Sequence, residues 1–85
     1  MSYWYLYLIR CRDNSLYTGI TTDVAKRFAL HNNGTGAKYL RGRGPLTLVF
    51  QKKIGSRSLA AATEIKVKKL PKAQKENLVK GRFKI

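Results

Sequence analysis

The feature that most constrains the fold is an aromatic and branched segment at residues 3–10, Tyr-Trp-Tyr-Leu-Tyr-Leu-Ile-Arg. Aromatic and β-branched side chains favour strands, and the scarcity of polar positions predicts a strand buried on both faces. Turn-forming residues follow at 12–15, and residues 16–20 predict a second strand. The two segments therefore predict an antiparallel hairpin.

The loop length of this hairpin decides which tyrosines share a face of the sheet. A shift of register by one residue would move every side chain to the other face. A three-residue loop at 12–14, with Asn14 left-handed, places Tyr7 opposite Gly19 and puts Tyr7 and Tyr17 on one face. A two-residue turn would separate the two tyrosines. We predict the three-residue loop.

The first helix is expected to run from Asp23 to a stop at Gly34, with a threonine cap at 21 or 22. Its apolar face would consist of Val24, Ala25, Phe28 and Ala29. A glycine-rich irregular stretch at 34–45 follows this helix.

Further along, residues 46–53 predict a third strand and residues 55–56 open a second helix, which Pro71 limits. Proline suits the first turn of a third helix, which would run to about residue 80. The pattern predicts an α/β (α+β) fold in the order β-β-α-β-α-α. A chain of 85 residues holds one domain, which we place at 1–80, with residues 81–85 as a loose basic C-terminal tail.

Positive charge dominates the composition, with 18 Lys and Arg against 4 carboxylates and a formal net charge of +14. Such an excess repels itself in a compact protein, so a polyanionic partner is expected. We favour nucleic acid over a membrane, because the C-terminal helix carries lysines but only a thin apolar stripe. The single cysteine, Cys11, and the lack of a signal-peptide core or long apolar run predict a cytoplasmic protein.

Several short motifs occur in order along the chain: Tyr5-Leu6-Tyr7, Tyr17-Thr18-Gly19, residues 23–27 with His31, residues 36–39, and Glu64. This ordered set resembles the GIY-YIG nuclease superfamily, and in particular its small, stand-alone bacterial members, the YhbQ-like proteins. The resemblance extends over roughly residues 3–79. It implies a three-stranded antiparallel sheet flanked by helices, and hydrolysis of DNA phosphodiesters with a divalent metal.

Position by position, the resemblance implies catalytic roles for Tyr7, Tyr17, Arg27 and His31 and metal binding by Glu64. Asn77 is a further candidate whose alignment with the family stays open. The chain departs from the family pattern in two places. The first motif keeps only its tyrosine, and Ile20 stands where many active relatives carry a lysine.

The carboxylates indicate how many metal ions such a site would hold. The chain has only Asp13, Asp23, Glu64 and Glu76, on different predicted elements, so a two-metal cage is not expected. One Mg²⁺ or Mn²⁺ ion held by Glu64, waters and the substrate phosphate fits better. The alternative is that Glu64 forms a surface ion pair with Lys68, four residues later.

The remaining candidates carry alternatives of the same kind. A tyrosine with a pKa near 10 needs nearby cations to act as a base, and the sequence does not decide between Tyr7 and Tyr17. Both tyrosines also suit a purely structural role in the sheet core. Arg27 is suited to a forked pair of hydrogen bonds with a phosphate, whereas His31 is also typical of a helix end.

Basic residues supply the expected nucleic-acid contacts: Lys26, Lys38, Arg41 and Arg43. The later lysines either extend this footprint or face water: Lys66, Lys68, Lys69, Lys72 and Lys75. The sequence thus predicts a metal-dependent, structure-directed DNA endonuclease that acts as a monomer without a small-molecule cofactor. The alternative is a non-catalytic module on the same scaffold that binds DNA or RNA, with DNA favoured.

Overall fold

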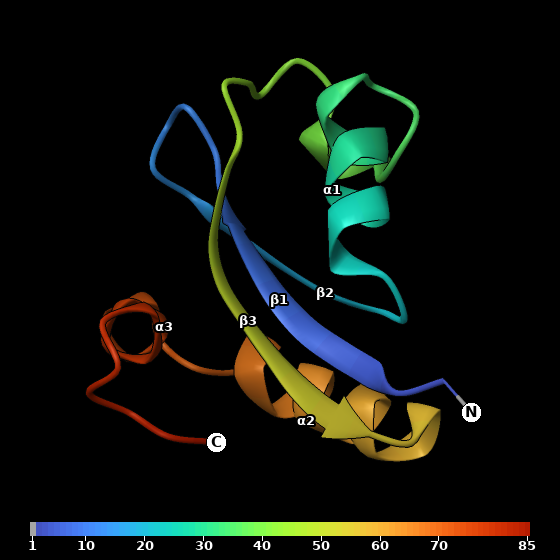
Figure 1. Ribbon diagram of the computed structural model, residues 1–85. Coiled ribbons are helices and arrows are strands. Elements are labelled where there is room, and N and C mark those ends of the chain that lie inside the picture. The colour runs from blue at the N-terminus through green and yellow to red at the C-terminus, as the bar shows by residue number, and fades with distance from the viewer. Residues whose placement is uncertain (1) are drawn as a thin grey trace.

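The computed structural model describes residues 2–85. A three-stranded antiparallel sheet has the strand order β2-β1-β3, and three helices surround it (Figure 1). The elements are β1 (Trp4–Arg10), β2 (Leu16–Thr21), α1 (Val24–Asn32), a 3-10 turn η1 (Lys38–Leu40), β3 (Thr47–Gly55), α2 (Arg57–Lys68) and α3 (Lys72–Val79). The predicted fold class and the order β-β-α-β-α-α are confirmed.

The N-terminal hairpin has the predicted three-residue loop. Asn14 is left-handed with φ of 71°. The N–H of Cys11 donates to the carbonyl of Ser15 at 2.9 Å. Tyr7 therefore pairs with Gly19 across the β1–β2 ladder, as the register argument required.

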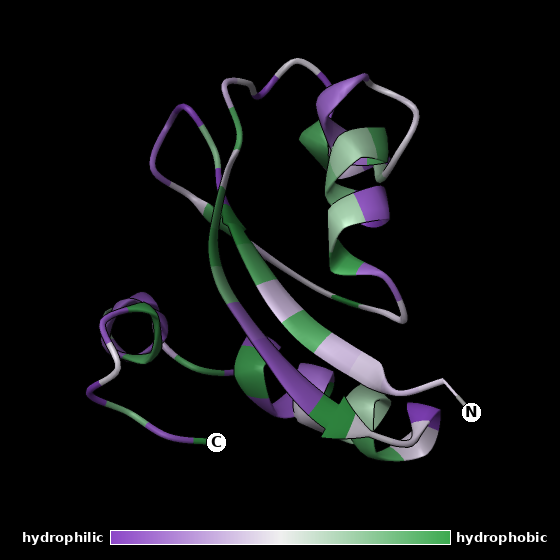
Figure 2. Ribbon diagram, viewed as in Figure 1, coloured by the Kyte–Doolittle hydropathy of each residue, from purple (hydrophilic) through white to green (hydrophobic). Residues whose placement is uncertain are grey.

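The central strand β1 supplies both halves of the core, because its side chains alternate between the two faces of the sheet. Tyr7 and Ile9 belong to a cluster with Val24 of α1 and Leu40 of η1. The cluster on the opposite face joins residues of β1, α2 and α3: Leu6, Leu8, Val67 and Leu78. Figure 2 shows green hydrophobic bands alternating with paler ones along β1. Helix α1 thus lies on one side of the sheet, and α2 and α3 lie on the other.

Helix α1 differs from the expectation at its start and on its buried face. Asp23 itself is the cap, since its side chain accepts from the N–H of Lys26 at 3.0 Å. Val24 and His31 are buried and Phe28 is half-buried, whereas the alanines at 25 and 29 are exposed. The alanines are small enough to lie either on the buried face or in solvent, so the sequence alone did not define the buried face. Packing against the sheet buried the face that carries the larger side chains.

The later elements begin close to their predicted positions. Ser56 caps α2 by accepting from the N–H of Leu59 at 3.1 Å. Pro71 stands just before α3 instead of within its first turn. None of the helices within residues 2–85 is long and apolar enough to cross a bilayer.

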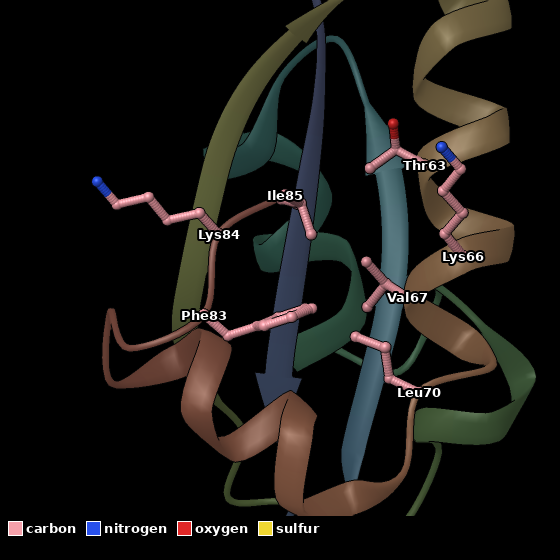
Figure 3. Close-up of a pocket in the computed structure, with 7 residues that line it drawn as sticks. All are labelled: Thr63, Lys66, Val67, Leu70, Phe83, Lys84 and Ile85. Carbon is pink, nitrogen blue, oxygen red and sulfur yellow. The ribbon is translucent and has the colours of Figure 1, made fainter.

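The C-terminal tail, expected to be loose, packs against the sheet. Phe83 and Ile85 join the cluster beneath α2 and α3, and the ammonium of Lys52 donates to the carbonyl of Ile85 at 2.8 Å. In Figure 3 the ring of Phe83 points toward Val67 and Leu70 across a shallow apolar groove. Burial of these two apolar side chains outweighs the cost of ordering the tail.

An ion pair connects the end of β1 to α3. The guanidinium of Arg10 donates to both carboxylate oxygens of Glu76, at 2.8 Å and 2.6 Å. Both side chains are about one quarter exposed, at 26% and 22%. The Arg10 guanidinium, through this hydrogen bond, holds the pKa of Glu76 below its usual range. The charged pair therefore stabilises the folded state wherever the carboxylate is ionised.

Replacing Glu76 by glutamine should lower the free energy of unfolding by about 1 kcal/mol at pH 7, the upper part of the range for partly exposed pairs. Because the folded pKa lies below the unfolded value near 4.3, this contribution is fully present above that value and is lost as pH falls through the folded pKa. Urea unfolding of the wild type and Glu76→Gln between pH 3 and 7 measures the difference. A difference that does not shrink in acid would contradict this role for the pair.

Candidate active site

The Tyr7 phenol lies directly over Gly19 on the neighbouring strand. A Cβ atom added at Gly19 would lie 2.5 Å from Cζ of Tyr7, far inside van der Waals contact, and nearer still to its hydroxyl oxygen. Position 19 must therefore be glycine, because any side chain there would collide with the Tyr7 ring. The bare backbone of β2 lets the phenol cross this strand toward its outer edge, while the side chain as a whole is only 2% exposed.

The hydroxyl of Tyr7 meets His31, which α1 brings onto the same face of the sheet. The Tyr7 Oη and His31 Nε2 atoms are 2.8 Å apart in a buried hydrogen bond. The backbone N–H of Ala37 donates to His31 Nδ1 at 3.0 Å. Since a backbone N–H can only donate, Nδ1 carries no proton, and the neutral ring has its hydrogen on Nε2. His31 therefore donates to Tyr7, and its ring nitrogens are both used.

Burial sets the protonation states of this pair. It lowers the pKa of His31, and the nearby Arg27 guanidinium lowers it further, so the imidazole is neutral at pH 7. Burial also raises the pKa of Tyr7 to about 12; the neighbouring Tyr17 and Glu64 add to the rise, and Arg27 opposes it. Arg27 is therefore close enough to the Tyr7 hydroxyl to favour its ionised form.

Tyr17 stands beside this pair at the centre of an aromatic group. Its ring centroid is 6.4 Å from that of Tyr7 and 5.6 Å from that of His31. Its other neighbour is Tyr39 of η1, which stacks on it at 5.8 Å. The Arg43 guanidinium covers the outer face of Tyr39 at 4.2 Å. Tyr7 and Tyr17 thus share one face of the sheet, as the sequence predicted, and η1 packs against Tyr17.

Glu64 approaches the site from α2, on the other side of the sheet. Its side chain is 22% exposed, and one carboxylate oxygen lies 3.3 Å from the Lys68 ammonium. The ion pair expected as the alternative role of Glu64 is present. The carboxylate also lines an open depression of about 510 Å³ together with Ile20, Arg57, Ser58 and Ala61. Its charge acts on Tyr7 as well, so both proposed roles of Glu64 are compatible with its position.

The donor set around Glu64 fits a single hard cation. Within residues 2–85 no three His, Cys, Asp or Glu side chains gather in a group that could hold a metal. Mg²⁺ commonly takes one or two carboxylates and fills its remaining positions with waters and substrate phosphates. A half-buried carboxylate beside an open depression is suited to that arrangement, once the Lys68 ammonium moves aside.

The predicted nucleic-acid-binding residues and Asn77 lie outside the Tyr7–His31 pair. Lys26, Lys38 and Arg41 are exposed and free to meet a phosphate backbone. Arg43 is instead held by the Tyr39 ring and by Asp13, at 3.2 Å. Asn77 lies on α3, where its amide contacts Gln74 at 3.4 Å. That helix packs on the face of the sheet opposite α1, so the structure does not bring Asn77 to the Tyr7–His31 pair.

Sequence reasoning assigned no role to four residues that contribute to this site. Gly36 packs against His31, since a Cβ there would lie 2.8 Å from the His31 Cα, and Ala37 fixes the tautomer. Tyr39 belongs to the motif at residues 36–39, and its ring stacks on that of Tyr17. Arg57 opens α2 two turns before Glu64 and brings a cation to the depression that Ile20 and Glu64 also line. The position of Arg57 directly after the Ser56 cap was the available signal.

Known proteins match this chain in sequence over nearly its whole length. The GIY-YIG catalytic domain family matches residues 3–77. A UPF0213 protein of Cronobacter sakazakii is 64% identical over 81 residues, which cover 95% of this chain and 85% of that protein. The UPF0213 protein YhbQ of Salmonella typhimurium is 60% identical over 82 residues, covering 96% of this chain and 82% of the relative.

Two solution structures share the fold. A UPF0213 protein of Bacillus halodurans has a TM-score of 0.59 and 46% identity, covering 94% of this chain and 84% of the other. A protein from E. faecalis has a TM-score of 0.66 and 38% identity, covering 95% and 86%. The likeness thus extends over nearly the whole of each chain.

Substituting Gly19 by alanine should displace the Tyr7 ring, because the new methyl group and the phenol would occupy the same space. We expect a loss of about 1–3 kcal/mol in unfolding free energy, typical of overpacking, and a large change in the Tyr7 ring resonances. Gly44→Ala is the matched control, since the nearest atom to a Cβ there is 3.9 Å away. Unchanged Tyr7 resonances in Gly19→Ala would contradict the packing described.

The tautomer of His31 is directly measurable by nitrogen-15 NMR. We expect an unprotonated Nδ1 and a protonated Nε2 at pH 7, because the Ala37 N–H occupies Nδ1. In Gly36→Ala the added methyl pushes the ring away, so the mixture of tautomers found in free imidazole should return. A wild-type ring protonated on Nδ1 would show that His31 accepts from Tyr7 instead.

Proposed function

Because this chain belongs to the GIY-YIG family, we propose that it is a metal-dependent DNA endonuclease whose active site surrounds the Tyr7 hydroxyl. The observation that supports this most strongly is the set of groups that act on that hydroxyl, which is hydrogen-bonded to His31 at 2.8 Å. The Arg27 guanidinium on α1 favours its ionised form, and the Glu64 carboxylate on α2, across the sheet, acts more weakly in the opposite direction.

Hydrolysis of a phosphodiester requires stabilisation of the charge that develops on the phosphoryl oxygens. Arg27 would supply it with a pair of forked hydrogen bonds, a geometry that lysine cannot provide. Arg57 would contact the phosphate from the depression beside Glu64. A divalent ion bound by Glu64 would act as a Lewis acid on the phosphate and assist departure of the leaving oxygen.

Tyr7 is the residue we assign to the attacking water. Its oxygen accepts from His31 Nε2–H, and Arg27 also favours negative charge there, whereas the Tyr17 hydroxyl has no such donor within residues 2–85. In its ionised form, Tyr7 takes a proton from the water and becomes a neutral phenol as the water oxygen bonds to phosphorus and the bond to the leaving sugar oxygen breaks. The leaving oxygen receives a proton from solvent. Tyr17 holds the Tyr7 and His31 rings in place and lines the approach to them.

The substrate follows from the charge distribution. Exposed Lys26, Lys38 and Arg41 would bind phosphates, and such contacts carry no base sequence information. We therefore expect the protein to select DNA by its structure, such as a flap, nick or branch. Binding should weaken on the order of 10³–10⁵-fold between 50 and 200 mM salt if six to ten phosphates are neutralised.

The cleavage rate should rise with pH across the range from 6 to 9. A base whose pKa lies near 12 is almost wholly protonated there, so its active form increases about tenfold per pH unit until another step limits the rate. Tyr7→Phe should lose cleavage at every pH in this range, while Tyr17→Phe should keep the slope with a reduced rate. A pH-independent rate in the wild type would rule out Tyr7 as the base.

Glu64→Gln and Arg27→Ala should each reduce Mg²⁺- or Mn²⁺-dependent cleavage by about 10²-fold or more, the scale for loss of one charge-stabilising group, while DNA binding survives. Glu76→Gln and Arg82→Ala are the matched controls, because both residues lie outside the site. Gel assays on nicked, flapped, branched and single-stranded DNA provide the measurement. Cleavage by neither the wild type nor the controls would favour a non-catalytic binding module, and cleavage that persists in both site variants would contradict the assignment.

A further inference from the structure

A second depression lies at the outer edge of β2, next to the candidate active site. It has a volume of about 300 Å³ and is lined by Leu16, Tyr17, Thr18, Tyr39, Lys68 and Lys75. It shares Tyr17 with the aromatic group beside Tyr7 and His31. Residues of β2, η1, α2 and α3 meet here, so the folded chain brings together segments that are distant in sequence.

The charge of this depression is positive, because its lining contains two lysines and no carboxylate. Lys68 already pairs with Glu64 on its own helix at 3.3 Å. Lys75, by contrast, makes no ion pair within residues 2–85, and it is half-buried while the other lysines of that range are exposed. The half-buried Lys75 ammonium, which has no counterion among these residues, is suited to bind an anion.

A threonine with a buried hydroxyl borders the same depression. Thr18 lines the depression and is only 3% exposed. Its Oγ1 atom has no hydrogen-bond partner among the described residues, and it is the single buried side-chain polar atom there of which this is true. Buried hydroxyls are nearly always paired, so this group can donate to or accept from a ligand.

The aromatic walls indicate which part of a nucleic acid would fit. One face of Tyr39 stacks on Tyr17, and Arg43 covers the other. Both faces of Tyr39 are therefore covered, so this residue offers no free ring face of the kind on which single-strand-binding proteins stack bases. The lining of the depression instead combines two lysines with a buried threonine hydroxyl, and these groups match a phosphate.

We propose that the depression binds a second phosphate of the nucleic-acid strand, beside the one at the cleavage site, through Lys75, Lys68 and the Thr18 hydroxyl. The proposal rests on the proposed function for the identity of the polymer as a nucleic acid. A phosphate held here also draws the Lys68 ammonium away from Glu64. That shift leaves the Glu64 carboxylate free to bind a cation. A phosphate in the second site therefore favours metal binding at the cleavage site.

Binding of a fluorescein-labelled DNA duplex, measured by anisotropy over a salt series with EDTA present, tests the site without cleavage. Lys75→Gln should weaken binding several-fold and reduce the slope of log K against log salt by about one. Lys84→Gln is the matched control, because that side chain points away from the protein in Figure 3, and it should change neither quantity. Equal effects of the two variants, or none in Lys75→Gln, would overturn the proposal.

Thr18→Val separates a ligand-binding role from a structural one. Removal of an unpaired buried hydroxyl should leave the melting temperature unchanged or raise it, whereas the loss of a phosphate contact should weaken duplex binding. Weaker binding with undiminished stability supports the site, and unchanged binding contradicts it. A Thr18 amide resonance that responds to inorganic phosphate as strongly as to the duplex would assign the depression to free phosphate and overturn the strand proposal.

The binding experiments are independent of the nuclease proposal. If Lys75→Gln and Thr18→Val weaken binding but the wild type cleaves no DNA, the phosphate site stands and the catalytic proposal fails. If the wild type cleaves DNA and both variants bind as the wild type does, the catalytic proposal stands and the second phosphate site fails.

Discussion

The position of the Tyr7 phenol is the constraint on which the rest of the structure depends. The ring lies over Gly19, where any side chain would collide with it, and its hydroxyl is hydrogen-bonded to His31 at 2.8 Å. The hairpin register decides the first contact, and the placement of α1 decides the second. Because the phenol crosses β2, groups on helices from both sides of the sheet can act on one oxygen atom. A different register would leave Arg27 and Glu64 without a common target.

The irregular segment between α1 and β3 is part of the site. Ala37 holds the His31 ring in one tautomer, and Tyr39 stacks on Tyr17. Arg43 then fixes the outer face of Tyr39 and pairs with Asp13 of the hairpin loop at 3.2 Å. Each of these contacts is weak alone, but together they order a glycine-rich stretch whose own backbone has little reason to adopt one conformation. The positions of Tyr17 and His31 beside Tyr7 therefore depend on a segment that lies outside the sheet.

Burial and reactivity oppose each other at Tyr7. The packing that positions the phenol also raises its pKa to about 12, so the free protein holds the group in its neutral form. The donors around it, His31 and Arg27, favour the charged form, and a cation beside Glu64 would act in the same direction. With few carboxylates and a net charge of +14, the chain would, in the proposed function, meet its substrate mainly through basic groups. Its acidic groups are used for specific tasks, such as the pairing of Glu76 with Arg10.

Local chemistry in the sequence was enough to determine the element order, the three-residue hairpin loop and the shared face of Tyr7 and Tyr17. These follow from strand periodicity and from the left-handed preference of Asn14, which act over a few residues. The buried face of α1, the packing of the C-terminal tail, the tautomer of His31 and the convergence of Arg57, Lys68 and Lys75 near β2 were decided only by the tertiary structure. Each of these depends on contacts between residues far apart in the chain, and a helix or loop pattern alone does not specify which distant surface it will meet.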